Sequence, residues 1–304
     1  MSITSIDWLG ARTQSGPADC VEALRAAFGN LGAALRAVPK KRGKQGFDRS
    51  DGLFLGDMSV GTMSFGGDAM RGWVWLELTG TGCGWVSDWG QCENDLSQLA
   101  DFQYKRVDIA LDTYKREVTH DTVVSAHSNG MFTTGGKPPS MSQIVPADAY
   151  EGRTIYVGKR DQPKFMRAYE KGYEQARKYP KLQVTHWDGV PIADWYRLEL
   201  ELKAKNQPLP HDLIENRDEY FAGAYPYLQS VLDVEPHVLR MSREKGPQRS
   251  LASMLEIIRQ QYGNSLFTAL TAYHGDIGAL LAKIIGTQHN QKLLEDGVLM
   301  VDHF

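Results

Sequence analysis

The chain has 304 residues, of which 42% are hydrophobic and 23% are charged, and its formal net charge is −3 at pH 7. This composition is typical of a soluble globular protein with one large domain or two ordinary ones. There is no run of about eighteen apolar residues and no secretory signal, so we expect a cytoplasmic protein without a membrane span. Cys20, Cys83 and Cys92 are odd in number and lack C-x-x-C spacing, which argues against a disulfide framework and a structural zinc site.

The first half of the chain alternates between strand and helix patterns. Apolar periodicity predicts strands at residues 3–11, 53–65 and 70–78, and helices at residues 17–31 and 90–102. Residues 40–51 form a predicted basic loop. Residues 78–85, LTGTGCGW, lack the lysine and spacing of a P-loop, so we interpret their glycines as a turn between two strands.

The second half begins with a similar series and then changes character. We predict a strand at 105–113, a helix at 119–130, a loop at 135–146, a hairpin with a short helix within 154–181, and a strand at 193–204. The segment Gln207-Pro208-Leu209-Pro210 is a plausible domain boundary. Beyond it helical spacing dominates, with Gly263 expected to end one helix before another at residues 266–285.

These elements predict an α+β fold, with an antiparallel sheet that carries helices on one face. The motifs SIDWLG and WVWLELTG in the first half echo RVDIALD and WYRLELELK in the second. The echo predicts a pseudo-duplicated split β-α-β unit. We therefore expect a sheet domain at residues 1–205, with similar halves at about 1–100 and 101–205, and a mostly helical region at residues 206–304.

Three predicted strands carry charged residues at alternate positions. Because successive side chains point to opposite faces of a strand, each strand has one apolar and one charged face. The charged faces hold Arg106, Asp108 and Asp112 in the first strand, Arg167, Tyr169 and Lys171 in the second, and Arg197, Glu199, Glu201 and Lys203 in the third. If these strands are neighbours, acidic, basic and phenolic groups share one side of the sheet.

Such a face has two interpretations. Alternating charges also form the solvated side of an ordinary antiparallel sheet, where cross-strand ion pairs stabilise it modestly. Alternatively, clustered carboxylates hold a cation, and oxygen ligands favour magnesium, manganese or calcium over zinc. A cation bordered by basic groups is suited to a phosphate, which Tyr169 would attack as a nucleophile.

The residues that carry a family resemblance follow one another in order. They are LTGTGC at 78–83, RVDIALD at 106–112, TIYVGKR at 154–160, FMRAYEKG at 165–172 and YRLELELK at 196–203. Together they resemble the replication initiation factor family, the rolling-circle initiators of filamentous phages and small plasmids (Rep_trans). The resemblance implies an endonuclease that nicks one DNA strand at an origin through a covalent 5′-phosphotyrosine intermediate and later rejoins the ends.

The same resemblance implies roles for individual residues. Tyr169 would be the nucleophile, assisted by Arg167 and Lys171, although Tyr156 and Tyr173 lie close by and stay open as alternatives. Mg²⁺ or Mn²⁺ would be bound by Asp108, Glu199 and Glu201, with Asp112 in reserve. DNA phosphates would be bound by Lys159, Arg160, Lys164 and Arg197.

The implied partner is origin DNA, single-stranded or cruciform, inside a bacterial host cell. Because the sequence lacks a P-loop, a host helicase and polymerase would do the remaining work, and a homodimer is a further expected partner state. Two other functions stay open. One is a non-catalytic DNA-binding protein that controls replication, and the other is a metal-dependent phosphodiesterase that uses water and forms no covalent intermediate.

Overall fold

The computed structural model describes residues 3–182, 184–205, 207–239 and 251–289. The chain divides into two compact units, Met1–Met241 and Ser242–Phe304. In the second unit, α8 (Leu251–Ala272) continues through Gly263, where the sequence predicted an end, and α9 (Ile277–Ile284) follows. A helix interior tolerates a glycine at a cost of about 1 kcal/mol, so Gly263 alone does not end α8. None of the helices described is long and apolar enough to cross a membrane.

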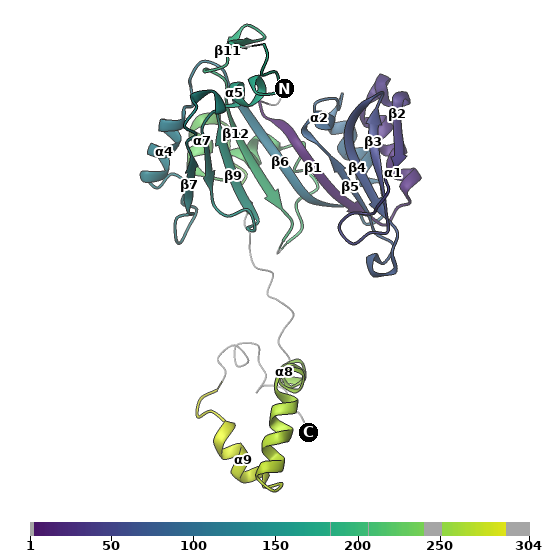
Figure 1. The fold of residues 1–304 in the computed structure, drawn as a ribbon, viewed down its shortest axis with the longest axis vertical. Helices are drawn as coiled ribbons and strands as arrows, with labels where there is room; N and C mark the ends of the chain where they lie inside the picture. Colours follow the sequence, from purple (N-terminus) through teal and green to yellow (C-terminus); the bar gives the residue numbers. More distant parts are fainter. Residues whose placement is uncertain (1–2, 183, 206, 240–250, 290–304) are drawn as a thin grey trace. The chain divides into compact units, whose positions relative to one another are not determined.

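The first unit is built on a ten-stranded antiparallel sheet with the order β2-β3-β4-β5-β1-β6-β12-β9-β8-β7 (Figure 1). Its strands are β1 (Ser5–Thr13), β2 (Leu35–Pro39), β3 (Arg49–Leu55), β4 (Met58–Phe65), β5 (Val74–Leu78), β6 (Gln103–Thr113), β7 (Met141–Ile144), β8 (Thr154–Val157), β9 (Lys164–Tyr169) and β12 (Tyr196–Lys203). The short strands β10 (His186–Trp187) and β11 (Val190–Pro191) pair with each other. The predicted α+β class with a large antiparallel sheet is confirmed.

The order of the strands is mirrored about the central pair of β1 and β6. Each half starts with its central strand, continues into a helix, and returns through successive antiparallel strands to the neighbour of that central strand. The helices in equivalent positions are α1 (Pro17–Ala27) and α4 (His120–Ser128). This mirrored order matches the internal echo in the sequence, and it places the last strands of the two halves, β5 and β12, on either side of the central pair.

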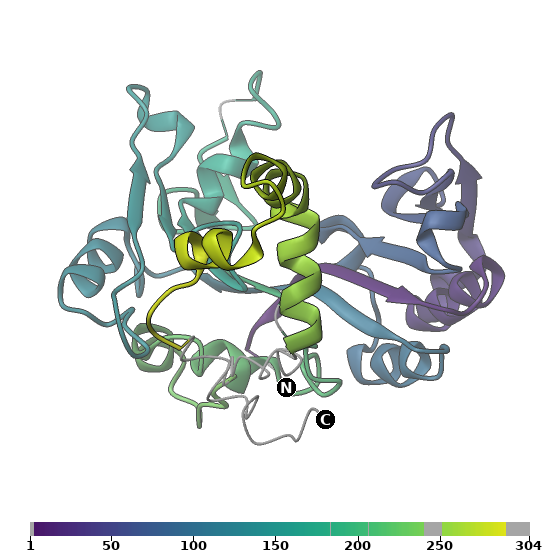
Figure 2. The same ribbon diagram turned by 90° about the horizontal axis from the view of Figure 1, so that it is seen from below.

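Helices cover one face of the sheet, as the alternation of residues predicted. Figure 2 shows them on the same side of the strands. Besides α1 and α4 these are α3 (Trp89–Ser97), α6 (Arg217–Ala222) and α7 (Pro226–Leu232). The apolar alternate residues of β6, β9 and β12 belong to the buried core on this side: Val107, Ile109, Leu111, Met166, Ala168, Leu198, Leu200 and Leu202.

The first unit continues past the predicted boundary at residue 205 and ends at Met241. Leu209, Leu213 and Phe221 are buried in the same core as the sheet. The segment with the prolines at 208 and 210 therefore packs against the sheet and is not a linker between domains. The helices α6 and α7 complete the cover over the apolar face, and only the later helices lie in the second unit.

Three local features differ from the predicted elements. The predicted strand at 53–65 is a hairpin of β3 and β4, in which Gly56 adopts a positive φ of 62° that permits the tight turn. β2 and β7 fall in segments without a clear strand pattern. Residues Gly80–Cys83 form a short helix, α2, instead of a turn between strands, and the Thr79 hydroxyl caps it by accepting from the Gly82 N–H.

A prediction follows for the core. Leu200 lies in the middle of β12 with no exposed surface, so Leu200→Ala should lower the free energy of unfolding of the first unit by about 2–5 kcal/mol. All seven tryptophans lie within Met1–Met241, so tryptophan fluorescence in a denaturant titration reports this unit selectively. The control is Leu31→Ala, since Leu31 is 44% exposed. Equal losses for the two variants would contradict this description of the core.

Candidate active site

The charged face of the sheet forms an open cleft of about 610 Å³. The residues that line it come from β1, β6, β12, β9 and β8. Others come from α5 (Lys171–Ala176), which follows β9 directly. Ten charged side chains line it: Asp7, Arg106, Asp108, Glu151, Arg160, Arg167, Lys171, Glu174, Arg177 and Glu199. Five are acidic and five are basic, so the cleft has balanced charge, and its chemistry depends on which charges are paired.

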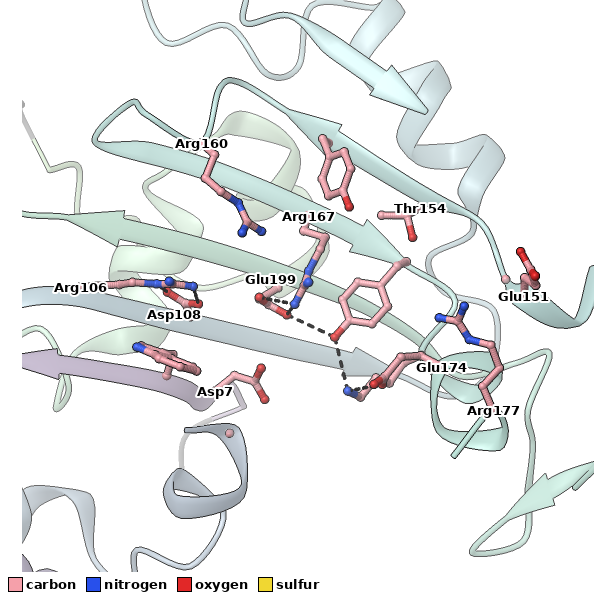
Figure 3. A pocket seen from close by; sticks show the side chains of 16 residues that line it. Asp7, Arg106, Asp108, Glu151, Thr154, Arg160, Arg167, Glu174, Arg177 and Glu199 are labelled. Carbon is pink, nitrogen blue, oxygen red and sulfur yellow. Dashed lines mark hydrogen bonds and ion pairs between the residues drawn. The ribbon is translucent and has the colours of Figure 1, made fainter. Parts of the chain in front are cut away.

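The register of the strands brings the central groups together. Glu199 of β12 lies opposite Arg167 of β9, and Arg197 lies opposite Tyr169. On the other side of β12, Glu201 lies opposite Asp108 of β6. The structure thus confirms that the charged alternate positions of three strands face the same side. Figure 3 shows Arg167 and Glu199 joined in the middle of the cleft.

Tyr169 lies at the floor of the cleft with 6% of its surface exposed. Its hydroxyl donates a hydrogen bond to Glu199 Oε2 at 3.2 Å, and Lys171 Nζ donates to the same hydroxyl at 3.4 Å. Burial raises the pKa of Tyr169 well above its ordinary value and the charge of Glu199 adds to this, whereas Arg197 and Arg167 oppose it. The phenol is therefore neutral at rest, with a carboxylate placed to take its proton.

Glu199 is a buried carboxylate held by a guanidinium. Arg167 Nη2 lies 2.6 Å from both Glu199 oxygens, and the Arg167 guanidinium lies 4.8 Å from the centre of the Tyr169 ring. Burial alone would lower the pKa of Arg167, but Glu199 raises it above the ordinary value. The three side chains form one unit, because removing any of them leaves a buried polar or charged partner without compensation.

Lys171 is placed by the close packing of α5. The next residue, Gly172, lies so near the backbone of Ile192 that a Cβ would be 2.1 Å from the Ile192 carbonyl oxygen. Only glycine allows this approach, which brings Lys171 toward the Tyr169 hydroxyl. Lys171 Nζ also forms an ion pair with Glu174 at 2.6 Å, so part of its charge is already neutralised.

The predicted metal ligands are distributed over two ion-paired groups. Arg106 bonds both oxygens of Asp108, at 2.8 and 2.6 Å, and lies 2.8 Å from Glu201, while Lys203 pairs with Glu201 as well. Burial raises the pKa of Asp108 to about 6, Arg106 opposes this, and the neighbouring glutamates add to it. Glu199 pairs separately with Arg167. Within the described part of the chain, no three His, Cys, Asp or Glu side chains are placed to hold a metal ion.

Arg197 was predicted to bind DNA, and its guanidinium forms three hydrogen bonds within the sheet. Nε and Nη2 donate to Asp112 at 2.8 and 2.6 Å, and Nη1 donates to Asp7 at 2.7 Å. The residue is 8% exposed. Its position ties β12 to both central strands, so the structure gives it a role in holding Asp7 and Asp112. Asp112, the predicted reserve ligand, is engaged in the same network.

Lys164 was also predicted to bind DNA, and it lies on the opposite face. It is register partner to Leu202, and its ammonium donates to the carbonyl of Ala224 at 2.5 Å and lies 4.0 Å from the ring centre of Tyr225. Burial lowers the pKa of Lys164 to about 8. Lys164 lies on this face because side chains alternate along β9, so Lys164 shares a face with Met166 and not with Arg167.

The other candidates differ in whether they line the cleft. Arg160 lines the cleft from the turn between β8 and β9, whereas the exposed Lys159 lies outside the cleft. Tyr156 also lines the cleft, is half-buried and stacks on Phe165 at 5.6 Å. Tyr173, on α5, is not part of the lining. Tyr156 is therefore the alternative phenol that this geometry supports.

The sequence reasoning did not predict four charged residues of the cleft, Asp7, Glu151, Glu174 and Arg177. Asp7 sits at a β-bulge in β1, between the register pairs of Ile6 and Trp8, so simple alternation does not predict where its side chain points. Arg177 follows α5 and reaches into the cleft beside Glu174 (Figure 3). The sequence signal for Arg177 was that it lies in the predicted hairpin-and-helix segment at 154–181, which is rich in lysine and arginine.

Comparisons with known proteins agree with this fold. The model of a family described as replication initiation factor matches residues 102–254. Among solved structures, the rolling circle replication initiator protein from Geobacillus stearothermophilus is similar, with a TM-score of 0.53 and 20% identity over 72% of this chain and 83% of that chain. At this identity the likeness supports the fold alone. No curated protein matches the chain.

The burial of Lys164 predicts an unusual pH dependence of stability. Its pKa is about 8 in the folded state against about 10.4 for an unfolded lysine, so the unfolded state binds more protons between these values. Relative to Lys164→Met, the wild-type protein should therefore gain about 2 kcal/mol of stability as the pH rises from 8 to above 10. Denaturant titrations followed by tryptophan fluorescence measure this difference. The exposed Lys159, changed to Met, is the control for charge loss, and a similar slope for both variants would contradict the burial of Lys164.

Proposed function

The chain belongs to the replication initiation factor family, and from this premise we propose that it starts rolling-circle replication by nicking one DNA strand at an origin. The observation that carries the proposal is the contact of a phenol with a carboxylate and an ammonium on the floor of a cleft. The Tyr169 hydroxyl lies 3.2 Å from Glu199 Oε2 and 3.4 Å from Lys171 Nζ. A nucleophile with an adjacent base and an adjacent cation is the usual arrangement for covalent catalysis.

In the proposed reaction, the oxygen of Tyr169 attacks the phosphorus of the scissile phosphodiester. The phenol proton passes to Glu199, the bond between phosphorus and the 3′ oxygen breaks, and the 3′ oxygen takes a proton from solvent. The products are a 5′-phosphotyrosine and a free 3′ hydroxyl that primes synthesis. Attack of a 3′ hydroxyl on the phosphotyrosine reverses these steps and rejoins the ends.

Two arginines support the binding of the phosphate. Arg160 and Arg177 line the cleft, are exposed, and form no ion pair within the described residues, unlike Arg106 and Arg167. Figure 3 shows them entering the cleft from different sides of the Arg167–Glu199 pair. Their charges are therefore available to a phosphate, whose developing negative charge they would stabilise.

We also propose that the nicking reaction uses Mg²⁺ or Mn²⁺ as a cofactor. Asp108 and Glu201 have the right oxygen donors and lie opposite each other, but as they lie Arg106 already neutralises both. A bound ion would supply Lewis-acid polarisation of a phosphoryl oxygen. The residues supply the remaining functions: Glu199 accepts the proton, Lys171 and Arg167 stabilise the phenolate, and the host helicase and polymerase act on the nicked origin in the bacterial cytoplasm.

The role of Tyr169 is tested on a labelled single-stranded origin oligonucleotide. Tyr169→Phe should abolish the covalent protein–DNA adduct on a denaturing gel, because the attacking oxygen is absent, while origin binding stays within about twofold of wild type. Tyr156→Phe is the matched control and should still form the adduct. If the control loses the adduct and Tyr169→Phe keeps it, Tyr156 is the nucleophile. If the wild-type protein cleaves without any adduct, the reaction is hydrolysis by water.

The need for a metal ion is tested with the same assay. If the proposal is correct, EDTA should reduce adduct formation by at least about 100-fold, and added Mn²⁺ or Mg²⁺ should restore it. Asp108→Asn should weaken the response to Mn²⁺, whereas Asp57→Asn, at an exposed carboxylate outside the cleft, should not. Full activity in EDTA would show that the cations Arg106, Arg167 and Lys171 meet the charge requirement without a metal.

A further inference from the structure

The charged face of the sheet continues beyond the cleft onto β1 and β5, which lie beside β6 (Figure 1). Trp8 and Arg12 of β1, Trp75 of β5, Trp73 just before β5, and Lys105 at the bulge of β6 near Arg12 together form what we call the aromatic strip. All five are half-buried. Half-exposed indoles on an open sheet face leave apolar ring surface in contact with water. A ligand that covers these rings would therefore bind favourably.

The register places Trp8, Arg12 and Trp75 on neighbouring positions of β1 and β5, and Trp73 joins them through its contact with Arg12. Trp8 lies opposite Asp108, which lines the cleft, and Trp75 lies opposite Arg12 farther along β1. Between them is Gly10, where an added Cβ would lie 3.7 Å from the Trp75 ring. The absence of a side chain at Gly10 lets the indole lie over the backbone. Arg12 lies four positions after Trp8 along β1, so the strip extends about 13 Å from the cleft.

Cations alternate with the rings along the strip. The Arg106 guanidinium lies 5.0 Å from the Trp8 ring centre, and that of Arg12 lies 4.1 Å from the ring centre of Trp73. Arg–tryptophan pairs of this kind also accept a base or a phosphate at their open side.

The strip carries positive charge that has no acidic partner. Arg12 donates only to the neutral amide oxygen of Gln103, at 3.0 and 2.8 Å, and among the described residues neither Arg12 nor Lys105 forms an ion pair. Burial lowers the pKa of Lys105, and the positive charge of Arg12 lowers it further. Two adjacent uncompensated cations favour an anion. The nearest carboxylate on β5, Glu77, is the register partner of Gly10, and it accepts hydrogen bonds from Thr62 and Gln45 instead of pairing with Arg12 or Lys105.

We propose that the aromatic strip binds the single-stranded DNA that flanks the scissile phosphate, with bases stacked on its indoles and phosphates held by Arg12 and Lys105. Aromatic platforms combined with unpaired cations are the general means by which proteins bind single strands without reading their sequence. A duplex does not fit this chemistry, because its bases are already stacked and paired. The location of the scissile phosphate rests on the proposed function, whereas binding of a single strand by the strip does not.

The experiment measures fluorescence anisotropy of a labelled oligothymidylate, which contains no origin sequence, with the full-length protein. Trp75→Ala should weaken binding by about 5- to 100-fold, the range expected for the loss of one stacked base. The double variant Arg12→Gln/Lys105→Gln should weaken binding and reduce the slope of log K against log salt by about 1.4, since each phosphate contact contributes about 0.7.

Matched controls lie in the same half of the sheet domain. Trp85 is 45% exposed and contacts Met58 at the opposite end of β4 from the partner of Trp75, so Trp85→Ala should leave binding unchanged. Arg36→Gln, at an exposed position of β2, is the control for charge. Thermal melts exclude misfolding, and the glutamine variants, which replace half-exposed polar groups, keep the test decisive if Trp75→Ala unfolds.

Three results would overturn the proposal. They are unchanged binding in both strip variants, equal weakening in the controls, and equally tight binding of a duplex of the same length. The adduct assay on the origin oligonucleotide separates this proposal from the nicking reaction. If the wild-type protein forms no adduct but the strip variants lose oligothymidylate binding, the nicking proposal fails and the strip stands. If adducts form and the strip variants bind normally, only the strip fails.

Discussion

A single buried carboxylate, Glu199, holds the groups on which the proposed chemistry depends. It is 5% exposed and accepts hydrogen bonds from both the Tyr169 phenol and the Arg167 guanidinium. A charge buried this deeply is stable only with a close cation, so the ion pair with Arg167 is needed to keep Glu199 in this position. This constraint explains why the residues of the cleft form paired units and why its unpaired arginines lie at the periphery.

The paired units also depend on a sheet with two different faces. Helices seal one face with an apolar core, so the central strands are rigid, and the opposite face carries charges whose positions the backbone register determines. Arg197 strengthens this arrangement by joining β12 to Asp112 of β6 and Asp7 of β1. Placing reactive side chains on packed strands, and not on loops, holds them in a fixed geometry before substrate binds.

Much of this arrangement could be predicted from the sequence because strand alternation is a local property. The leucines at 198, 200 and 202 and the charged residues between them specify both faces of β12 without any knowledge of its neighbours. The same rule, applied strictly, places Lys164 on the apolar face with Met166, so the prediction that it binds DNA conflicted with the pattern itself. The predicted DNA-binding role of Lys164 came from the family resemblance and did not take account of the face of β9 on which the residue lies.

Other features depend on contacts that no local pattern encodes. The bulge that turns Asp7 into the cleft and the prolines that fold residues 207–210 back onto the sheet are consequences of tertiary packing. Ion pairing is equally non-local: the sequence supplies clustered carboxylates, but whether arginine or a metal ion neutralises them depends on side chains from neighbouring strands. In this chain Arg106 lies two residues from Asp108 on the same face and reaches Glu201 across the strand pair, so one guanidinium pairs with both carboxylates.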